Sequence, residues 1–170
     1  MRDEYRHGFI FPHERGDGGD VMTVHHFSST GLIQNRVIGV IHSCHVGLTR
    51  TGVRLRVGER TDLRIRWPIS QIQNRCLRIG RYVVATIPIN AVRLEAGIFR
   101  RSTQRWNRWI GRIVLVESTD SGIVYTVKIH GEDWTLMGYG PVLGARQLSK
   151  PWDIVNVVVD PQRIALATVD

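Results

Sequence analysis

The segment Val53-Arg54-Leu55-Arg56-Val57 alternates apolar and basic residues, and Leu63-Arg64-Ile65-Arg66-Trp67 repeats the pattern a few residues further along. Because successive side chains of a β-strand point to opposite faces, each segment should present one buried and one solvated face. Residues 124–129, which are β-branched and aromatic, suit the same pleated surface. Glycines separate such runs at the short intervals of a small barrel. The sequence therefore predicts an all-β fold.

A repeat at a constant offset organises the chain. The segment Asn35-Arg36-Val37-Ile38-Gly39 recurs 72 residues later as Asn107-Arg108-Trp109-Ile110-Gly111. The same offset aligns Val83 with Val155 and Leu94 with Leu166. Self-similarity at a fixed spacing is the signature of repeated structural units.

This repeat predicts a division into two OB-like small β-barrels. We place the first barrel at residues 32–98 and the second at residues 99–170. Residues 1–31 are rich in turn-forming and polar residues, which indicates either an extended N-terminal arm with one short strand around Val21–Val24 or, equally well, a disordered tail.

Composition and charge limit the classes of function. The 170 residues are 42% hydrophobic and 22% charged, which is typical of globular proteins. The apolar runs are too short to span a bilayer and the N-terminus does not resemble a secretory signal, so we expect a cytoplasmic protein without membrane insertion. A net charge of +8 favours anionic partners. Cys44 and Cys76 are too few for a disulfide framework and are expected to be free thiols.

Two stretches resemble the TOBE/molbindin (Mop-like) module: Gly39-Val40-Ile41 with residues 77–87, and Gly111-Arg112-Ile113 with residues 152–161. The resemblance covers residues 33–168. It implies tandem five-stranded OB-like barrels that bind molybdate or a similar oxyanion at barrel interfaces. Related modules form the regulatory tails of ABC-transporter ATPases. The implied function is thus a non-catalytic ligand-binding or regulatory module whose partners are a small oxyanion, ABC-transporter components or further copies of the chain. No other cofactor is implied.

The resemblance also implies a ligand set. Molybdate binders of this family carry an Arg-Asn pair before the first strand's glycine, and here the asparagines are kept while Gln34 and Trp106 replace the arginines. Their Lys-x-Ser stretch is replaced by residues 88–90 and 160–162, which contain a proline without an N–H and an aspartate that would repel an anion. The predicted ligand residues are Asn35, Arg36, Thr86, Asn90, Asn107 and Arg108. An equally good interpretation is that both asparagines cap turns.

Nucleic-acid binding is the alternative function. The junction between the repeats interleaves arginine with tryptophan, and this combination suits a single strand because arginines contact phosphates and indoles stack on bases. The candidate residues are Arg100, Arg101, Arg105, Trp106 and Arg108, and the basic faces of the alternating strands would extend this surface. Against this, Trp109 would begin a strand and pack in the core. A third hypothesis is a structural subunit that docks on a larger complex through the N-terminal arm.

Metal binding and catalysis have little support in the sequence. On a regular strand His42 and Cys44 would share one face and offer two metal ligands, but no CxxC or HxxxH spacing accompanies them, and we predict no metal site. Catalytic motifs such as GxSxG and HExxH are absent, and Glu132-Asp133 in a turn is expected to be surface charge. We predict that the protein is not an enzyme.

Overall fold

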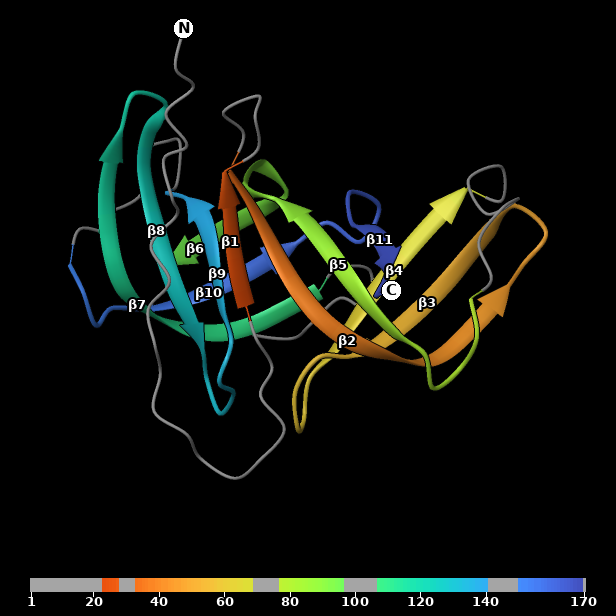
Figure 1. Cartoon of the computed structure of the whole chain (residues 1–170). Helices are drawn as coiled ribbons and strands as arrows, with labels where there is room; N and C mark the ends of the chain where they lie inside the picture. Colours follow the sequence, from red (N-terminus) through yellow and green to blue (C-terminus); the bar gives the residue numbers. More distant parts are fainter. Residues whose placement is uncertain (1–22, 28–32, 69–76, 97–106, 141–149, 170) are drawn as a thin grey trace, which may run out of the picture.

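The computed structural model describes residues 23–27, 33–68, 77–96, 107–140 and 150–169, and strands dominate this part of the chain (Figure 1). The all-β prediction is confirmed. The strands are β1 Thr23–Phe27, β2 Ile33–Val46, β3 Arg50–Arg56, β4 Asp62–Pro68, β5 Tyr82–Pro88, β6 Val92–Ala96, β7 Asn107–Thr119, β8 Gly122–Ile129, β9 Thr135–Tyr139, β10 Ile154–Val159 and β11 Ala165–Thr168. A single turn of 3-10 helix, η2 Ile89–Ala91, links β5 to β6.

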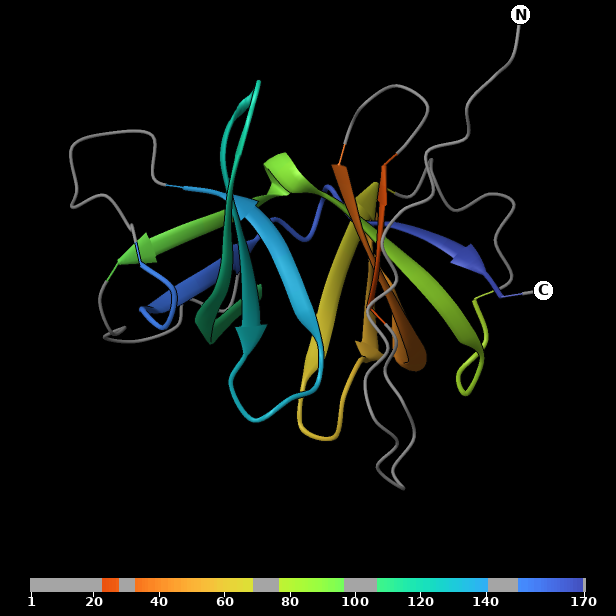
Figure 2. The ribbon, with the colours of Figure 1, turned by 60° about the vertical axis from the view of Figure 1, so that its left-hand side comes forward.

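The strands form two sheets that exchange their last strands. The first sheet has the order β11-β5-β2-β3-β4, with β1 also paired to β2, and the second is a closed barrel in the order β10-β6-β9-β8-β7. Strand β6 therefore leaves the first half of the chain to join the barrel, while β11 returns from the second half to pair with β5 (Figures 1 and 2). The boundary between the two units, placed between residues 98 and 99, stays a prediction. In the structure each half of the chain contributes one strand to the sheet of the other half.

Strand register follows the 72-residue offset. Ile38 pairs with Val84 between β2 and β5, and Ile110 pairs with Asn156 between β7 and β10. The first long strand of each half also bulges at the same point, between Ile41 and Ser43 in β2 and between Ile113 and Leu115 in β7. A bulge adds one unpaired residue and bends the strand, which helps a long strand to curve around a small barrel.

The core runs through both halves as one cluster. The inward residues of β3 and β4 are fully or almost fully buried, as the alternation predicted, and they belong to the same cluster as Trp134 and the inward valines of β10. Trp109 packs against this core as predicted, with its ring edge-on to Trp134 at 5.2 Å between ring centroids and an interplanar angle of 83°. Because burial of one large apolar side chain stabilises a fold by about 1.5–3 kcal/mol, this shared core joins the two halves strongly.

The N-terminal arm contributes one described strand. The expected strand around Val21–Val24 is observed as β1, shifted toward the C-terminus, and its Thr23 pairs with Val37 of β2. The remainder of the predicted arm, residues 1–22 and 28–31, lies outside the described residues. Within the described part of the chain there is no helix of the length and apolar character that a membrane crossing requires.

Candidate functional site

Asn35, a predicted ligand residue, lies in the interior and joins the two halves. Its side chain is 0% exposed. The amide Nδ2 donates to the carbonyl oxygens of Met137 at 3.0 Å and Ile87 at 3.3 Å, and Oδ1 accepts the N–H of Met137 at 2.6 Å. The carboxamide thus mimics a backbone peptide and satisfies both polar groups of one residue on β9. This is neither a turn cap nor an exposed anion donor.

Asn107 makes the equivalent contact in the opposite direction. Its Oδ1 accepts the N–H of Arg64 at 2.7 Å, and its Nδ2 donates to the carbonyl of Arg64 at 2.8 Å. Each asparagine of the repeated Asn-Arg motif therefore clamps a strand of the other half. The sequence repeat pointed to both asparagines. It gave no sign of their partners, because a contact with a residue 43 or 102 positions away leaves no local pattern in the sequence.

The other predicted ligand residues have separate surroundings. Arg36 and Thr86 are direct cross-strand partners on the outer face of the first sheet, where Arg36 is exposed. Asn90 is held by the guanidinium group of Arg163, which donates to its backbone carbonyl at 2.8 Å and to its Oδ1 at 2.7 Å. Arg108 lies on β7, with its Nη1 4.0 Å from Oε2 of Glu95. Of the predicted set, only Arg36 and Thr86 are thus neighbours of each other in the sheet register.

Most residues of the alternative nucleic-acid interface lie outside the described part of the chain. Arg100, Arg101, Arg105 and Trp106 belong to the undescribed residues 97–106, so their role as an interface stays a prediction. Arg108 is the member of this set that is described, and its ion pair with Glu95 is given above.

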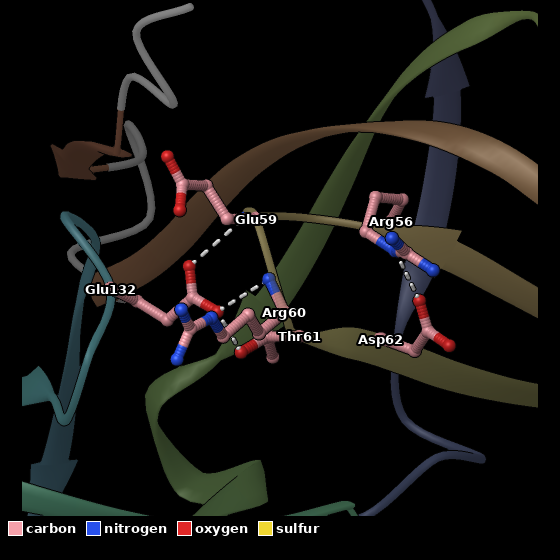
Figure 3. Close-up of polar contacts among 6 residues, drawn as sticks. All are labelled: Arg56, Glu59, Arg60, Thr61, Asp62 and Glu132. Atoms are coloured by element: carbon pink, nitrogen blue, oxygen red, sulfur yellow. Dashed lines mark hydrogen bonds and ion pairs between the residues drawn. The ribbon is translucent and has the colours of Figure 1, made fainter. Parts of the chain in front are cut away.

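Glu132 corrects the expectation of surface charge. It lies in the turn between β8 and β9, only 8% exposed, and its carboxylate contacts the turn between β3 and β4 (Figure 3). It accepts the backbone N–H groups of Glu59 at 3.1 Å and Arg60 at 3.0 Å and the hydroxyl of Thr61 at 2.5 Å. A side chain on Gly58 would overlap the carboxylate, so glycine is required there. The tip of one hairpin is therefore fastened to the tip of the other.

The outer surface of the β3–β4 hairpin gathers positive charge. Arg54 on β3 is opposite Arg64 on β4, and the next pair of outward positions joins Gly52 to Arg66. We call this surface the arginine face; its members are Arg50, Arg54, Arg56, Arg64 and Arg66. Asp62 shares the face, and its Oδ1 accepts a hydrogen bond from Nε of Arg56 at 2.8 Å (Figure 3). The alternating sequence predicted a solvated face here, and the basic faces of the strands belong to the nucleic-acid alternative.

A small cavity lies at one end of the arginine face. It has a volume of about 70 Å3, and its lining residues are Arg50, Arg66, Trp67, Pro68 and Gln162. Two hydrogen bonds fix the turn after β10 against β4: the N–H of Arg66 donates to the carbonyl of Pro161 at 2.9 Å, and Nε1 of Trp67 donates to the carbonyl of Ile164 at 2.8 Å. Arg50, Arg66 and Gln162, three of the lining residues, have side chains with several N–H donors suited to an anion.

Asp160, which the sequence suggested would repel an anion, is engaged within its own turn. Its Oδ1 accepts the N–H of Gln162 at 2.9 Å. Gln162 belongs to the stretch that replaces Lys-x-Ser in the second half, and it lines the cavity. The cavity's basic residues, however, come from β3 and β4, which no family motif indicated.

His42 and Cys44 do not lie on one face of β2, as they would on a regular strand. The bulge after Ile41 puts His42 on the exposed side, whereas Cys44 packs against the core opposite Val53. His42 and Cys44 therefore do not share a face, and burial raises the pKa of the Cys44 thiol. Among the described residues no three potential ligands from His, Cys, Asp and Glu gather around one point. Cys76 lies outside them.

The architecture defines a small β-barrel protein of OB-like type. The chain is similar in structure to the cytoplasmic molybdate-binding protein ModG, in a crystal form grown from PEG with molybdate bound. The TM-score is 0.64 at 17% sequence identity, and the match covers 79% of this chain and 96% of that one. This similarity establishes the fold. No protein-family model matches the chain, and no curated protein matches its sequence.

Proposed function

We propose that this protein is a non-catalytic module that binds a small oxyanion, and that the ligand occupies the cavity at the end of the arginine face. The observation that carries the proposal is the convergence of Arg50, Arg66 and Gln162 on one small hollow. Arginine suits this chemistry because its planar group donates two parallel hydrogen bonds to an oxyanion and stays charged at all physiological pH values.

Local electrostatics support an anion at this position. The described lining residues include two arginines and no carboxylate, and Asp62, the acidic residue on the arginine face, pairs with Arg56 at the opposite end of the hairpin. The walls are held by one backbone hydrogen bond, from Arg66 to Pro161, and by the bond from the Trp67 indole to Ile164, so the backbone on both sides of the cavity is fixed before the ligand arrives. Preorganised donors cost less conformational entropy on binding than mobile ones.

The finer parts of the sequence prediction belong to the same proposal. We include in it the duplication of a TOBE-type module, association with an ABC transporter and a cytoplasmic location. ModG is likewise described as cytoplasmic. Register conserved at the 72-residue offset supports the duplication. The predicted ligand set remains untested. Within it the exposed Arg36, beside Thr86, is the better candidate for an anion contact, because the carboxamides of Asn35 and Asn107 are engaged by backbone groups.

Thermal unfolding with molybdate, tungstate, sulfate and phosphate tests the proposal. A ligand that binds only the native state, present at a hundred times its Kd, stabilises that state by about 2.7 kcal/mol. For a chain of this size we expect Tm to rise by roughly 5–10 °C. Arg50→Gln combined with Arg66→Gln should abolish the rise, because the cavity then keeps no cationic donor among its lining residues.

A matched control removes two charges elsewhere. Arg112→Gln combined with Lys128→Gln lowers the net charge equally on the outer face of the barrel, where these residues pair between β7 and β8. This variant should keep the full rise in Tm. An unchanged rise in the Arg50/Arg66 variant would place the ligand elsewhere, and no rise with any of the four anions in the native protein would refute oxyanion binding.

A further inference from the structure

We infer that the Arg54–Arg56 end of the arginine face, away from the proposed oxyanion cavity that Arg50 and Arg66 line, is a docking surface for single-stranded nucleic acid. Its binding residues are Arg54 and Arg56 on β3, with Tyr82 of β5 as a stacking platform. This surface is different from the Arg/Trp junction that the sequence singled out.

Charge is concentrated in this hairpin far beyond the chain average. Residues 50–66 contain six arginines and two acidic residues, a net charge of +4 out of +8 for the whole chain. The hairpin at the equivalent place in the second half, residues 122–138, contains one lysine and two acidic residues and so carries −1. Half of the net charge of the chain therefore lies in one hairpin, and such a concentration of charge favours a polyanion as partner.

The two hairpins also differ in what covers their outer faces. In the second half, Val124 and Met137 point outward from β8 and β9 but are buried with Ile89 of η2, next to Tyr139. In the first half, Gly52 takes the place of Val124, and a side chain built there would have no atom within 4 Å. Arg54 is exposed. The first face is thus open where its counterpart is filled by apolar side chains.

An aromatic side chain lies on the same open face. Tyr82 pairs with Val40, and Val40 pairs with Arg56, so the three form one row across β5, β2 and β3. Adjacent strands are about 4.8 Å apart, which places the Tyr82 backbone roughly 10 Å from that of Arg56. Tyr82 is 62% exposed. A base stacked on its ring would leave the attached phosphate within reach of the arginines.

The geometry favours a single strand over a duplex or an acidic protein. β3 and β4 follow β2 as the second and third strands of an OB-like sheet, and by analogy this is the face on which OB folds bind oligonucleotides. A twisted sheet offers bases a surface on which to stack, whereas a duplex hides its bases inside. Arginine further matches phosphate by its bidentate geometry.

Fluorescence anisotropy with labelled oligothymidylate of about 16 nucleotides, the upper site size of one OB fold, tests the inference. Binding should weaken with salt, with a log–log slope of about −0.7 for each phosphate contacted. Arg54→Gln combined with Arg56→Gln should weaken binding roughly tenfold or more and make the slope shallower by about 1.4. Tyr82→Ala should weaken binding at least about fivefold, because stacking of one base is lost.

Arg112→Gln combined with Lys128→Gln is again the matched control and should leave oligonucleotide affinity within about twofold at equal salt, because those residues lie outside the face. Equal weakening by both double variants would overturn the inference in favour of a net-charge effect. Duplex DNA binding as tightly as the single strand would also overturn it, as would binding to phosphatidylserine vesicles without binding to the oligonucleotide. Arg54 and Arg56 do not line the cavity, so failure here leaves the oxyanion result unaffected.

Discussion

The β3–β4 and β8–β9 hairpins occupy equivalent places in the two halves and differ in almost everything that faces outward. Each has buried aliphatic residues on its inner side, and each is clamped by an asparagine of the other half, Asn107 on Arg64 and Asn35 on Met137. The outer side of the first hairpin carries arginines, whereas on the second the outward Val124 and Met137 are buried together with Ile89 of η2.

The difference shows which positions are constrained by the fold. Inward positions and clamped backbone groups must satisfy packing and hydrogen bonding in both halves, because an unpaired polar group or a void in the interior costs free energy. Outward positions of a hairpin escape that constraint once the other face is buried. In the second half these positions hold apolar residues that pack against η2, and in the first half they hold arginines.

The largest expected effect concerns the contact that joins the two hairpin tips. Glu132→Ala removes the acceptor for the N–H groups of Glu59 and Arg60 and for the Thr61 hydroxyl. Three hydrogen bonds to a charged acceptor are lost, one buried at Thr61 and two partly buried at Glu59 and Arg60, so we expect a loss of about 3–4 kcal/mol in the free energy of unfolding, measured by urea denaturation.

The neighbouring carboxylate provides a control for that change. The side chain of Asp133 is 94% exposed and contacts Lys128 at 3.3 Å. Asp133→Ala should change stability by less than about 0.5 kcal/mol, because exposed ion pairs contribute little. If both variants lost the same stability, Glu132 would not be the fastening between the hairpins.

The second prediction compares the two asparagine clamps. Asn35→Ala should destabilise the protein by about 2–3 kcal/mol and Asn107→Ala by about 1–2 kcal/mol, since the bonds of Asn35 are fully buried whereas those of Asn107 are partly buried. Amide hydrogen exchange should accelerate at Met137 in the first variant and at Arg64 in the second. An inverted order of stability, or exchange unchanged at these two amides, would contradict the clamp.

The smallest effects come from the paired glycines at the start of each half. A Cβ on Gly111 would overlap Cγ1 of Val127, whereas one on Gly39 would lie 2.9 Å from Cγ1 of Val57. We expect Gly111→Ala to cost about 2 kcal/mol and Gly39→Ala about 1 kcal/mol, measured by thermal unfolding. Gly52→Ala meets open space and should stabilise slightly, by about 0.5 kcal/mol, through a less flexible unfolded chain. A cost at Gly52 equal to that at Gly111 would show that close packing is not the cause.

The sequence singled out residues of the candidate site without their long-range partners. The repeated Asn-Arg motif marked Asn35 and Asn107, whose carboxamides hold backbone groups of the other half and whose role as ligand residues stays a prediction, while the arginines that line the cavity were expected on the basic, solvated faces of two strands. The sequence predicted a surface position for Glu132 because a turn considered without the rest of the fold is exposed to solvent. In each case the deciding partner lies in the other half of the chain.

The sequence by itself determined the all-β class, the inward and outward sides of β3 and β4, and the 72-residue register, because alternation and repetition are local patterns that each strand carries with it. Tertiary structure alone decided that β6 joins the barrel and that β11 pairs with β5. A strand of period two offers the same backbone donors and apolar face to either sheet, so only the packing of the whole core selects its partner. The same long-range packing brought the turn after β10 against β4 and thereby made the cavity between Arg66 and Gln162.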